Sequence, residues 1–291
     1  MKYLVALLIM MAFAANSLLS RVAVFTEGMD PSLFALYRTA SGALMLCLLL
    51  LVFNRKHALQ LVDPSQWKLK ENWLSGAFLA LYMIGFSYSY KSLNAGLGAL
   101  LLFSTVQLVL LVSSIRMGER PTKLQCIGYA ITIAGMASLV VPSLSVMGAT
   151  FIGMVCAVLA GVGWGGYTLL GRQSTQPLFR TGFAFIVATG FVLLGSSVIG
   201  LDTAATDKAL LLALISGMVT SACAYAAWYA LLPLISRFSA ALYQLSVPAL
   251  TFLGAVIWLN EIPNSLEVLA CVLTLAGIVV TQLPSRRDSK N

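Results

Sequence analysis

Long apolar runs separated by short polar stretches make up nearly the whole chain. A helix that spans a bilayer needs about 20 mainly apolar residues, and ten segments of the sequence meet this requirement. The segments are Tyr3 to Val24, Pro31 to Phe53, Asn72 to Tyr90, Asn94 to Ile115, Thr122 to Val141, Met147 to Leu170, Thr181 to Gly200, Ala209 to Leu234, Phe238 to Leu259 and Leu266 to Leu283. The pattern therefore predicts an all-α polytopic membrane protein with ten transmembrane helices.

The polar connections between these segments are too short to fold as domains, since the longest runs only from Asn54 to Glu71. Composition agrees with this interpretation, because 59% of the residues are hydrophobic and 10% are charged, outside the range of soluble domains. Any active or binding site must therefore lie among the helices, within the lipid bilayer. No soluble fold presents the net charge of +8, so we expect no nucleic-acid partner.

Basic residues are distributed unevenly among the connections. If the N-terminus is cytoplasmic, 14 of the 18 basic residues fall on the cytoplasmic side, and only Arg21, Lys91 and Lys208 fall outside, with Arg38 inside a span. Short cytoplasmic loops of membrane proteins are enriched in Lys and Arg. We therefore expect both termini to be cytoplasmic.

The chain repeats itself. Residues 93–142 align on 235–284 at a constant offset of 142, which places G-E-R-P at 118–121 on N-E-I-P at 260–263, and Ala-Gly at 134–135 on Ala-Gly at 276–277. At an offset of 151, NSLLSR at 16–21 aligns on YTLLGR at 167–172. The first span thus has a counterpart, and we expect it to be retained although its start resembles a secretory signal.

These alignments predict two repeats, residues 1–142 and 143–291, with five helices in each. An odd number of spans reverses the orientation of the second repeat, so the two form inverted repeats around a central cavity. This arrangement is typical of alternating-access carriers, which hold the substrate near the bilayer midplane at the repeat interface.

The ten spans, the paired E-x-P motifs and the Ala-Gly in the last span of each half resemble the drug/metabolite transporter superfamily, in particular its ten-span EamA-type exporters. Within that group the sequence is most similar to bacterial exporters of amino acids, including aromatic ones. The resemblance covers essentially the whole chain. It implies a basket-like bundle in the bacterial inner (plasma) membrane, with spans five and ten at the periphery, a small-molecule substrate, and a monomer or homodimer.

Aromatic residues lie at mid-depth in several spans. Tyr82, on span three, and Tyr225, on span eight, are phenols that need a polar partner inside the membrane. Packing is the alternative for any single aromatic residue. The stretch AGVGWGGY, from Ala160 to Tyr167, adds Trp164 and four glycines. We expect Gly161 and Gly165 to pack against a neighbouring helix, as small residues at this spacing do, and Gly163 and Gly166 to expose backbone to the cavity.

Polar residues at the same depth complete the candidate site. Amides and hydroxyls in spans also bond helix to helix, which is the alternative for each of them. Arg38 lies inside span two, where an unpaired charge is costly; it either pairs with Glu27 or Asp30 or binds a substrate carboxylate. The candidate substrate-binding residues are Phe13, Asn16, Ser17, Arg38, Tyr82, Gln107, Trp164, Tyr167, Tyr225, Trp228 and Gln244.

The sequence contains no motif for ATP binding, metalloprotease activity or metal binding. There is no G-x-x-x-x-G-K-[ST] motif for ATP and no H-E-x-x-H motif, and the five cysteines, which we expect to pack inside the bundle, lack metal-ligand spacing. We therefore expect no enzyme activity, no metal and no cofactor. Glu119 and Glu261 stand beside prolines and are expected to cap the helices that follow them, while Glu267 has no assigned role.

No carboxylate falls near mid-bilayer, which disfavours obligate proton coupling and permanently cationic substrates. The sequence predicts a carrier that exports amino acids, including aromatic or neutral ones, and related small metabolites by alternating access. A nucleotide-sugar or phosphate-ester translocator of the same superfamily is the alternative, although such a substrate would require several cations at cavity depth. Inverted repeats argue against a receptor or a structural membrane protein.

Overall fold

The structure of the protein is a computed structural model that describes residues 2–118, 120–144, 148–171, 174–231, 234–235 and 237–283. Within these ranges the regular elements are all helical, which confirms the all-α prediction. They are α1 (Lys2–Arg21), the π-helix η1 (Val22–Thr26), α2 (Pro31–Phe53), α3 (Arg55–Gln60), α4 (Pro64–Trp67), α5 (Lys70–Ser89), α6 (Ala95–Arg116), α7 (Lys123–Leu144), α8 (Ala149–Gly171), α9 (Pro177–Ile199), α10 (Asp207–Ile215), the π-helix η2 (Ser216–Cys223), α11 (Ala224–Leu231), α12 (Arg237–Leu259) and α13 (Ser265–Gln282).

Local sequence sets several helix starts. Asp30 caps α2 by accepting hydrogen bonds from the backbone N–H groups of Ser32 and Leu33, and Pro31 occupies the first helical position, where its missing N–H costs nothing. At α13, Asn264 and Glu267 form a reciprocal capping box. This contact gives Glu267 the role that the sequence left open.

Seven helical segments among the described residues are long and apolar enough to cross a membrane, which makes the chain a multi-pass membrane protein. The helices α5, α12 and α13 are not among the seven, although each coincides with an expected span. Polar and aromatic side chains lower the hydropathy of α5, and they are tolerated because this helix is buried between α8 and α9. The apolar parts of α12 and α13, Ser246–Leu259 and Ser265–Thr281, are shorter than the seven.

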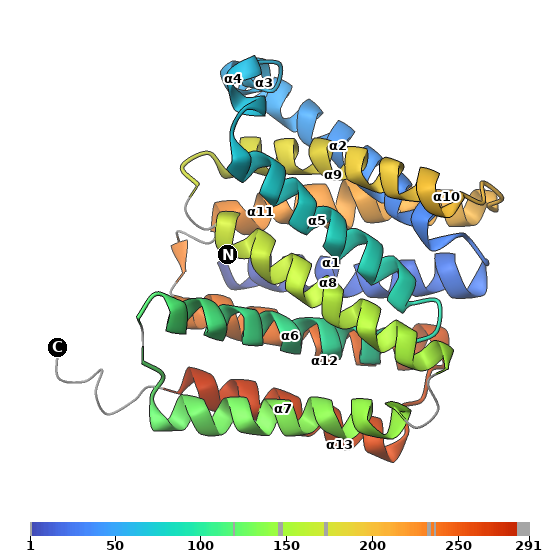
Figure 1. Cartoon of the computed structure of the whole chain (residues 1–291), viewed down its shortest axis with the longest axis vertical. Helices are drawn as coiled ribbons and strands as arrows, with labels where there is room; N and C mark the ends of the chain where they lie inside the picture. Colours follow the sequence, from blue (N-terminus) through green and yellow to red (C-terminus); the bar gives the residue numbers. More distant parts are fainter. Residues whose placement is uncertain are drawn as a thin grey trace.

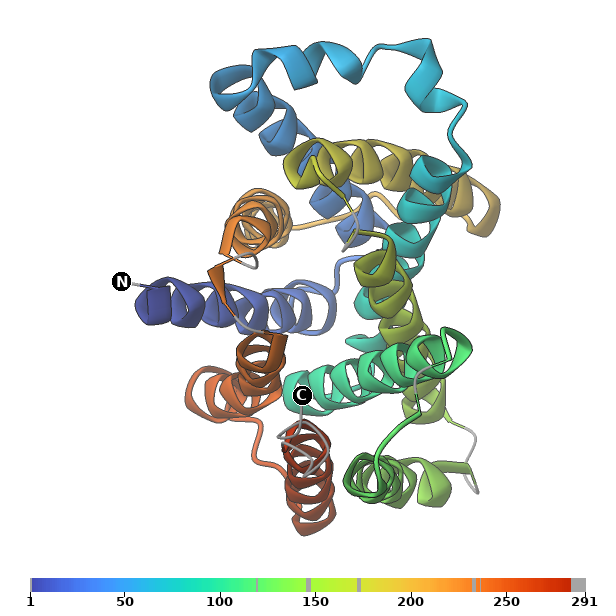
Figure 2. The ribbon, with the colours of Figure 1, turned by 90° about the vertical axis from the view of Figure 1, so that its left-hand side faces the viewer.

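The helices form stacked layers (Figures 1 and 2). The pair α2 and α9 lies toward one end of the long axis, the pair α7 and α13 lies at the other end, and α1, α5, α6, α8, α11 and α12 lie between them. The helix α7 packs mainly on α13 and has few buried residues. The peripheral position that the family resemblance implied for the last helix of each repeat is therefore found.

The helices α7 and α13 make reciprocal close contacts. A Cβ atom added at Gly135 would lie 2.5 Å from Thr274 Oγ1, and one added at Gly277 would lie 2.5 Å from Thr132 Oγ1. The offset of 142 maps Thr132 onto Thr274 and Gly135 onto Gly277. The two contacts are therefore related by the same offset as the aligned sequences.

The same relation holds for other helix pairs. The helix α5 packs on α8, and in the same way η2 packs on α1. The helix α6 also packs on α8, and α12 also packs on α1. In the two halves that the sequence predicts, α5 corresponds to the segment that contains η2, and α6 corresponds to α12. The packing thus agrees with two repeats whose helices exchange partners.

The four glycines of the AGVGWGGY stretch all serve close packing. A Cβ atom at Gly161 or Gly165 would approach Thr105 or Val109 of α6, whereas one at Gly163 would lie 2.5 Å from the backbone nitrogen of Tyr82 on α5. Gly166 faces the Phe78 ring of α5 in the same way. The prediction that Gly163 and Gly166 expose backbone to the cavity was therefore wrong, because a second helix covers them.

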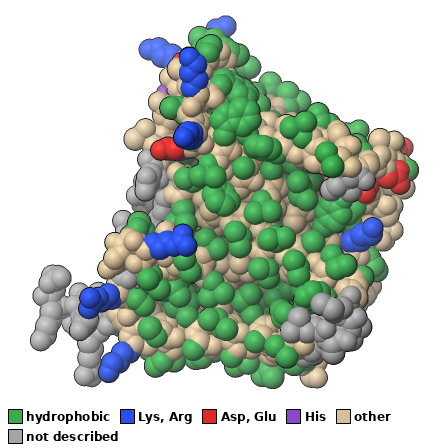
Figure 3. Space-filling model, in the orientation of Figure 1, with side chains coloured by type: hydrophobic (Ala, Val, Ile, Leu, Met, Phe, Trp, Pro, Cys, Tyr) green, Lys and Arg blue, Asp and Glu red, His purple; other side chains and the backbone are tan. Residues whose placement is uncertain are grey.

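Charged side chains gather at the two ends of the helices (Figure 3). On the visible face, Lys and Arg lie mostly at the end where α1 begins, and most Asp and Glu lie at the opposite end, near the connection from α9 to α10. Hydrophobic side chains cover the middle. This distribution is the one expected of a bundle with its helices across a bilayer.

Candidate functional site

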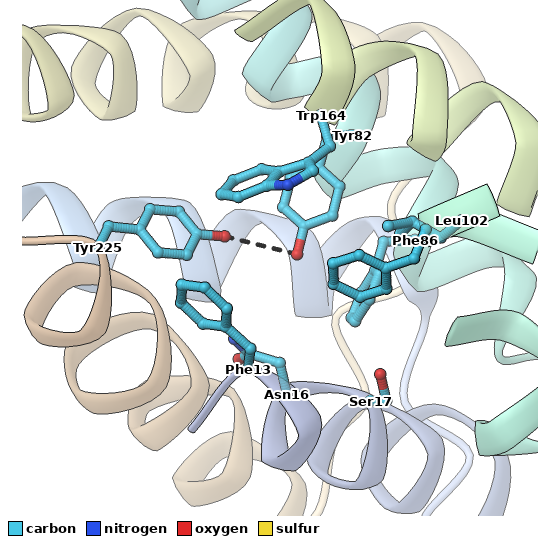
Figure 4. Close-up of a pocket in the computed structure, with 9 residues that line it drawn as sticks. Phe13, Asn16, Ser17, Tyr82, Phe86, Leu102, Trp164 and Tyr225 are labelled. Carbon is cyan, nitrogen blue, oxygen red and sulfur yellow. Dashed lines mark hydrogen bonds between the residues drawn. The ribbon is translucent and has the colours of Figure 1, made fainter. Parts of the chain in front are cut away.

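A small cavity lies at the centre of the bundle, between helices of both halves of the chain (Figure 4). Its volume is about 20 Å³, which is enough for one water molecule and far below the roughly 300–1,000 Å³ of pockets that hold small molecules. A substrate therefore requires the cavity to widen. The lining residues are Phe13, Asn16, Ser17, Tyr82, Phe86, Leu102, Phe103, Trp164 and Tyr225.

Aromatic rings from five helices converge on this cavity. The Trp164 ring lies 5.1 Å from that of Tyr82 and 4.9 Å from that of Tyr225, centroid to centroid. Phe13 meets Tyr225 edge to face at 5.6 Å, and Phe86 lies 5.3 Å from Tyr82. These separations are within the range of favourable aromatic pairs.

Asn16 is held by the π-helix η2. Its side-chain nitrogen donates to the backbone carbonyl of Thr220 at 2.7 Å, and its oxygen accepts from the hydroxyls of Ser216 and Thr220. The amide therefore joins two helices by hydrogen bonds, which was the alternative to substrate binding for Asn16. Its side chain still borders the cavity.

Arg38 lies fully buried directly behind the cavity wall. Its Nη2 donates to the Tyr82 hydroxyl at 2.9 Å and its Nε to the Ser221 hydroxyl at 3.0 Å. Its Cζ lies 4.7 Å from the centre of the Phe86 ring. Of the two alternatives for Arg38, a structural pair with Glu27 or Asp30 is not found, because Glu27 pairs with Lys208 and Asp30 caps α2.

The remaining predicted residues lie outside the cavity lining. Tyr167 packs against Trp164 at 5.5 Å and donates to Thr181, and Trp228 packs against Phe13. Gln107 is buried on α6, and Gln244 is half-buried on α12. Tyr167 and Trp228 thus support the wall from behind, whereas neither glutamine reaches it.

Several residues that line or support the cavity were not among the candidates predicted from the sequence. Phe86, Leu102 and Phe103 border the cavity, and Ser216 and Ser221 hold Asn16 and Arg38. The cluster of hydroxyl residues at 216–221, in the middle of an apolar run, was the available signal for the last two.

The helix cap made by Glu261 differs from the one expected. Glu261 accepts from the backbone N–H of Ala95 at the start of α6 and from Arg21, so it caps a distant helix rather than the following one. Glu119 lies outside the described residues.

Cys126 is exposed on α7 rather than packed inside the bundle, while the other four cysteines are partly buried. In the described part of the chain, no three His, Cys, Asp or Glu residues come together as a metal site.

Comparison with known proteins agrees with this architecture. Two segments of the chain, residues 1–141 and 151–283, match the EamA-like transporter family. An uncharacterized protein of Pseudomonas aeruginosa is 35% identical over 281 residues, which cover 97% of this chain and 94% of that protein. An uncharacterized transporter of Archaeoglobus fulgidus is 26% identical over 72% of this chain and 76% of its own length.

A solved crystal structure has a similar fold, with a TM-score of 0.66 and 18% identity over 98% of both chains. The family match covers nearly the whole sequence and falls into two segments. The chain is therefore a multi-pass membrane protein that belongs to the EamA-like transporter family.

Proposed function

We propose that the protein exports amino acids, including aromatic or neutral ones, and related small metabolites across the bacterial inner membrane. The observation that carries this proposal is the aromatic cavity between the two halves of the chain. Phe13 and Tyr82 come from the first half, and Trp164 and Tyr225 come from the second. A cavity built from both halves is suited to a carrier whose halves move relative to each other.

The walls of the cavity suit a small, partly apolar substrate. Rigid aromatic rings provide large contact areas, and each aromatic pair adds about 0.5–1.5 kcal/mol beyond the buried area. The hydroxyls of Ser17, Tyr82 and Tyr225 supply a few polar contacts, which is typical of sites for small ligands.

Alternating access follows from two proposed inverted five-helix repeats, residues 1–142 and 143–291. The reciprocal contacts between α7 and α13 and the exchanged partners of α5, α6 and α8 support this organisation. The two matched segments of the family support it as well. Because the cavity holds about one water, transport requires rocking of one repeat against the other to open it.

A nucleotide-sugar or phosphate-ester substrate fits the cavity less well. Phosphate recognition uses several charge-assisted hydrogen bonds, commonly from Arg or Lys. Among the described residues around the cavity, Arg38 is the one basic side chain, and Arg21 is committed to Glu261 near one end of α1.

Transport into liposomes tests the proposed function. Purified protein is reconstituted, and uptake of labelled phenylalanine, leucine, threonine and a nucleotide sugar is compared with that of protein-free liposomes. We expect saturable uptake of at least one amino acid and none of the nucleotide sugar. Uptake of the nucleotide sugar alone would overturn the proposed substrate class.

A further inference from the structure

The hydrogen bonds around the cavity leave donors without acceptors. Arg38 Nη1 and Trp164 Nε1 are buried atoms with no hydrogen-bond partner among the described residues. Burying an unsatisfied polar group costs about 1–3 kcal/mol, and more when the group is charged. Both side chains contact Tyr82, Arg38 through a hydrogen bond to its hydroxyl and Trp164 through its ring at 5.1 Å, so the group missing from this site is an acceptor beside Tyr82.

The two phenols add a third donor. Tyr82 and Tyr225 share one hydrogen bond between their hydroxyl oxygens, at 3.5 Å (Figure 4), while Arg38 donates to Tyr82. A phenol carries one proton, so this contact uses one of the two phenol protons. The other has no acceptor within the described part of the chain.

The amide oxygen that borders the cavity is already occupied. The side-chain oxygen of Asn16 receives two hydrogen bonds, from Ser216 and Thr220. The described carboxylates with assigned partners bind elsewhere, as Glu27 does with Lys208, Glu71 with Arg180, and Glu261 with Arg21. The charge of Arg38 thus has no carboxylate partner among the described residues, and no carboxylate is among the residues that line the cavity.

The position of Arg38 is fixed by close packing of α2 on η2. A Cβ atom at Gly217 would lie 2.3 Å from the backbone oxygen of Arg38, so only a glycine permits this approach. The same contact places Ser221 where it accepts from Arg38 Nε. The guanidinium is therefore held in place, with one nitrogen on Tyr82 and another uncommitted.

We propose that Arg38, Tyr82 and Trp164 form a carboxylate subsite, which binds the carboxylate of the transported amino acid or related metabolite, so that the carrier prefers organic carboxylates to neutral amides and amines. A carboxylate offers about four lone-pair sites, which match the donors of this cluster. An ammonium group would find no carboxylate among the described residues and would face the charge of Arg38. This inference rests on the proposed transport function and narrows its substrate class.

Binding to the purified protein separates these ligands by charge. Four probes share a phenyl ring and a short chain: 3-phenylpropionate as the anion, phenylalanine as the zwitterion, 3-phenylpropanamide as the neutral compound, and 3-phenylpropylamine as the cation. We expect affinity to fall in that order, with the anion bound about tenfold or more tightly than the amide, since hydrogen bonds to a charged group differ from neutral ones by this much. Equal affinity for anion and amide would overturn the proposal.

Variants assign the preference to the cluster. Arg38→Gln should abolish the advantage of 3-phenylpropionate over the amide, Arg38→Lys should restore part of it, and Tyr82→Phe should reduce it severalfold. Tyr88→Phe is the matched control, because Tyr88 lies on the same helix and bonds to Ser32 away from the cavity. If Arg38→Gln does not fold, Tyr82→Phe and the charge series on the parent protein still decide the question.

Uptake of the same four compounds into liposomes distinguishes two failures. If phenylalanine is transported and 3-phenylpropanamide enters as fast as 3-phenylpropionate, the carboxylate preference is wrong and the proposed export function stands. If neither these compounds nor any amino acid enters the liposomes above the protein-free rate, the proposed function itself fails.

Discussion

The side chains of Arg21 and Glu261 lie 2.6 Å apart and join three segments of the chain. Arg21 ends α1, Glu261 follows α12, and the second oxygen of Glu261 accepts from the backbone N–H of Ala95 at 2.8 Å, at the start of α6. Arg21 also donates to the backbone oxygen of Tyr90 after α5. Both charged side chains are largely buried, so this pair fastens one end of the bundle.

Glu261→Gln is expected to lower the free energy of unfolding by about 2 kcal/mol or more. The substitution removes a charge from a partly buried pair, leaving Arg21 without its counter-ion and weakening the cap of α6. The measurement is unfolding of the detergent-solubilised protein with increasing denaturant.

Glu71→Gln supplies the control for this measurement. The pair of Glu71 and Arg180 has nearly the same distance, 2.7 Å, but the Glu71 side chain is 73% exposed, and exposed pairs contribute about 0–1 kcal/mol. Equal losses in the two variants would show that burial does not set the strength of the Arg21–Glu261 pair.

Gly163→Ala is expected to destabilise the protein by about 1–3 kcal/mol, the usual cost of overpacking. The added methyl group would lie 2.5 Å from the backbone nitrogen of Tyr82 and 2.6 Å from the backbone oxygen of Phe78, and backbone atoms cannot rotate away. Gly190→Ala, with no atom within 4 Å of the added group, should be neutral or slightly stabilising because alanine favours helix. Thermal unfolding of both variants in detergent tests the contrast, and a Gly163 variant as stable as the parent would contradict the close approach of α5 and α8.

The sequence predicted the helices well because most expected spans are long apolar runs bounded by short polar stretches. It also placed aromatic residues of both halves at one depth, and Phe13, Tyr82, Trp164 and Tyr225 do line a common cavity. Periodicity along one helix reports its depth but not which neighbour covers each face. For that reason the partner helix of Gly163 was missed.

The partner of Arg38 was missed for a related reason. Proximity in sequence favoured Glu27 and Asp30, but both are held by nearer polar groups, Lys208 and the N–H groups of α2. Ser221 lies 183 positions away from Arg38, and only the packing of η2 on α2 brings the two together. The cluster of hydroxyl residues at 216–221 marks Ser221 as a candidate, but the sequence does not show which residue it contacts.

Both termini and the connection from α2 to α5 are predicted to face the cytoplasm. In a variant lacking the five native cysteines, Gln60→Cys should resist a membrane-impermeant maleimide applied to intact cells, and Asp202→Cys should react. Disruption of the membrane should make position 60 reactive. Labelling of position 60 in intact cells would reverse the topology.

Transport is expected to proceed without obligate proton coupling, because the described carboxylates lie away from the central cavity. The hydrogen bond from Lys208 lowers the pKa of Glu27, and the hydrogen bond from Ser65 lowers the pKa of Asp63. Both groups therefore stay ionised at and above their ordinary pKa range and take up no proton near neutral pH. Liposomes loaded with substrate at equal concentrations on both sides should show no accumulation after a pH jump, and accumulation would contradict this prediction.

Trp164→Ala is expected to slow transport about tenfold or more, because the Trp164 ring contacts Tyr82, Tyr225 and Phe13 around the cavity and each aromatic contact contributes about 0.5–1.5 kcal/mol. Trp164→Phe keeps an aromatic wall and should retain much of the rate. The control is Trp73→Ala, since Trp73 is 43% exposed and lies outside the cavity lining. Rates are measured in liposomes with equal amounts of folded protein. A parent-level rate for Trp164→Ala would mean that this aromatic cavity is packing between helices and that the substrate passes elsewhere.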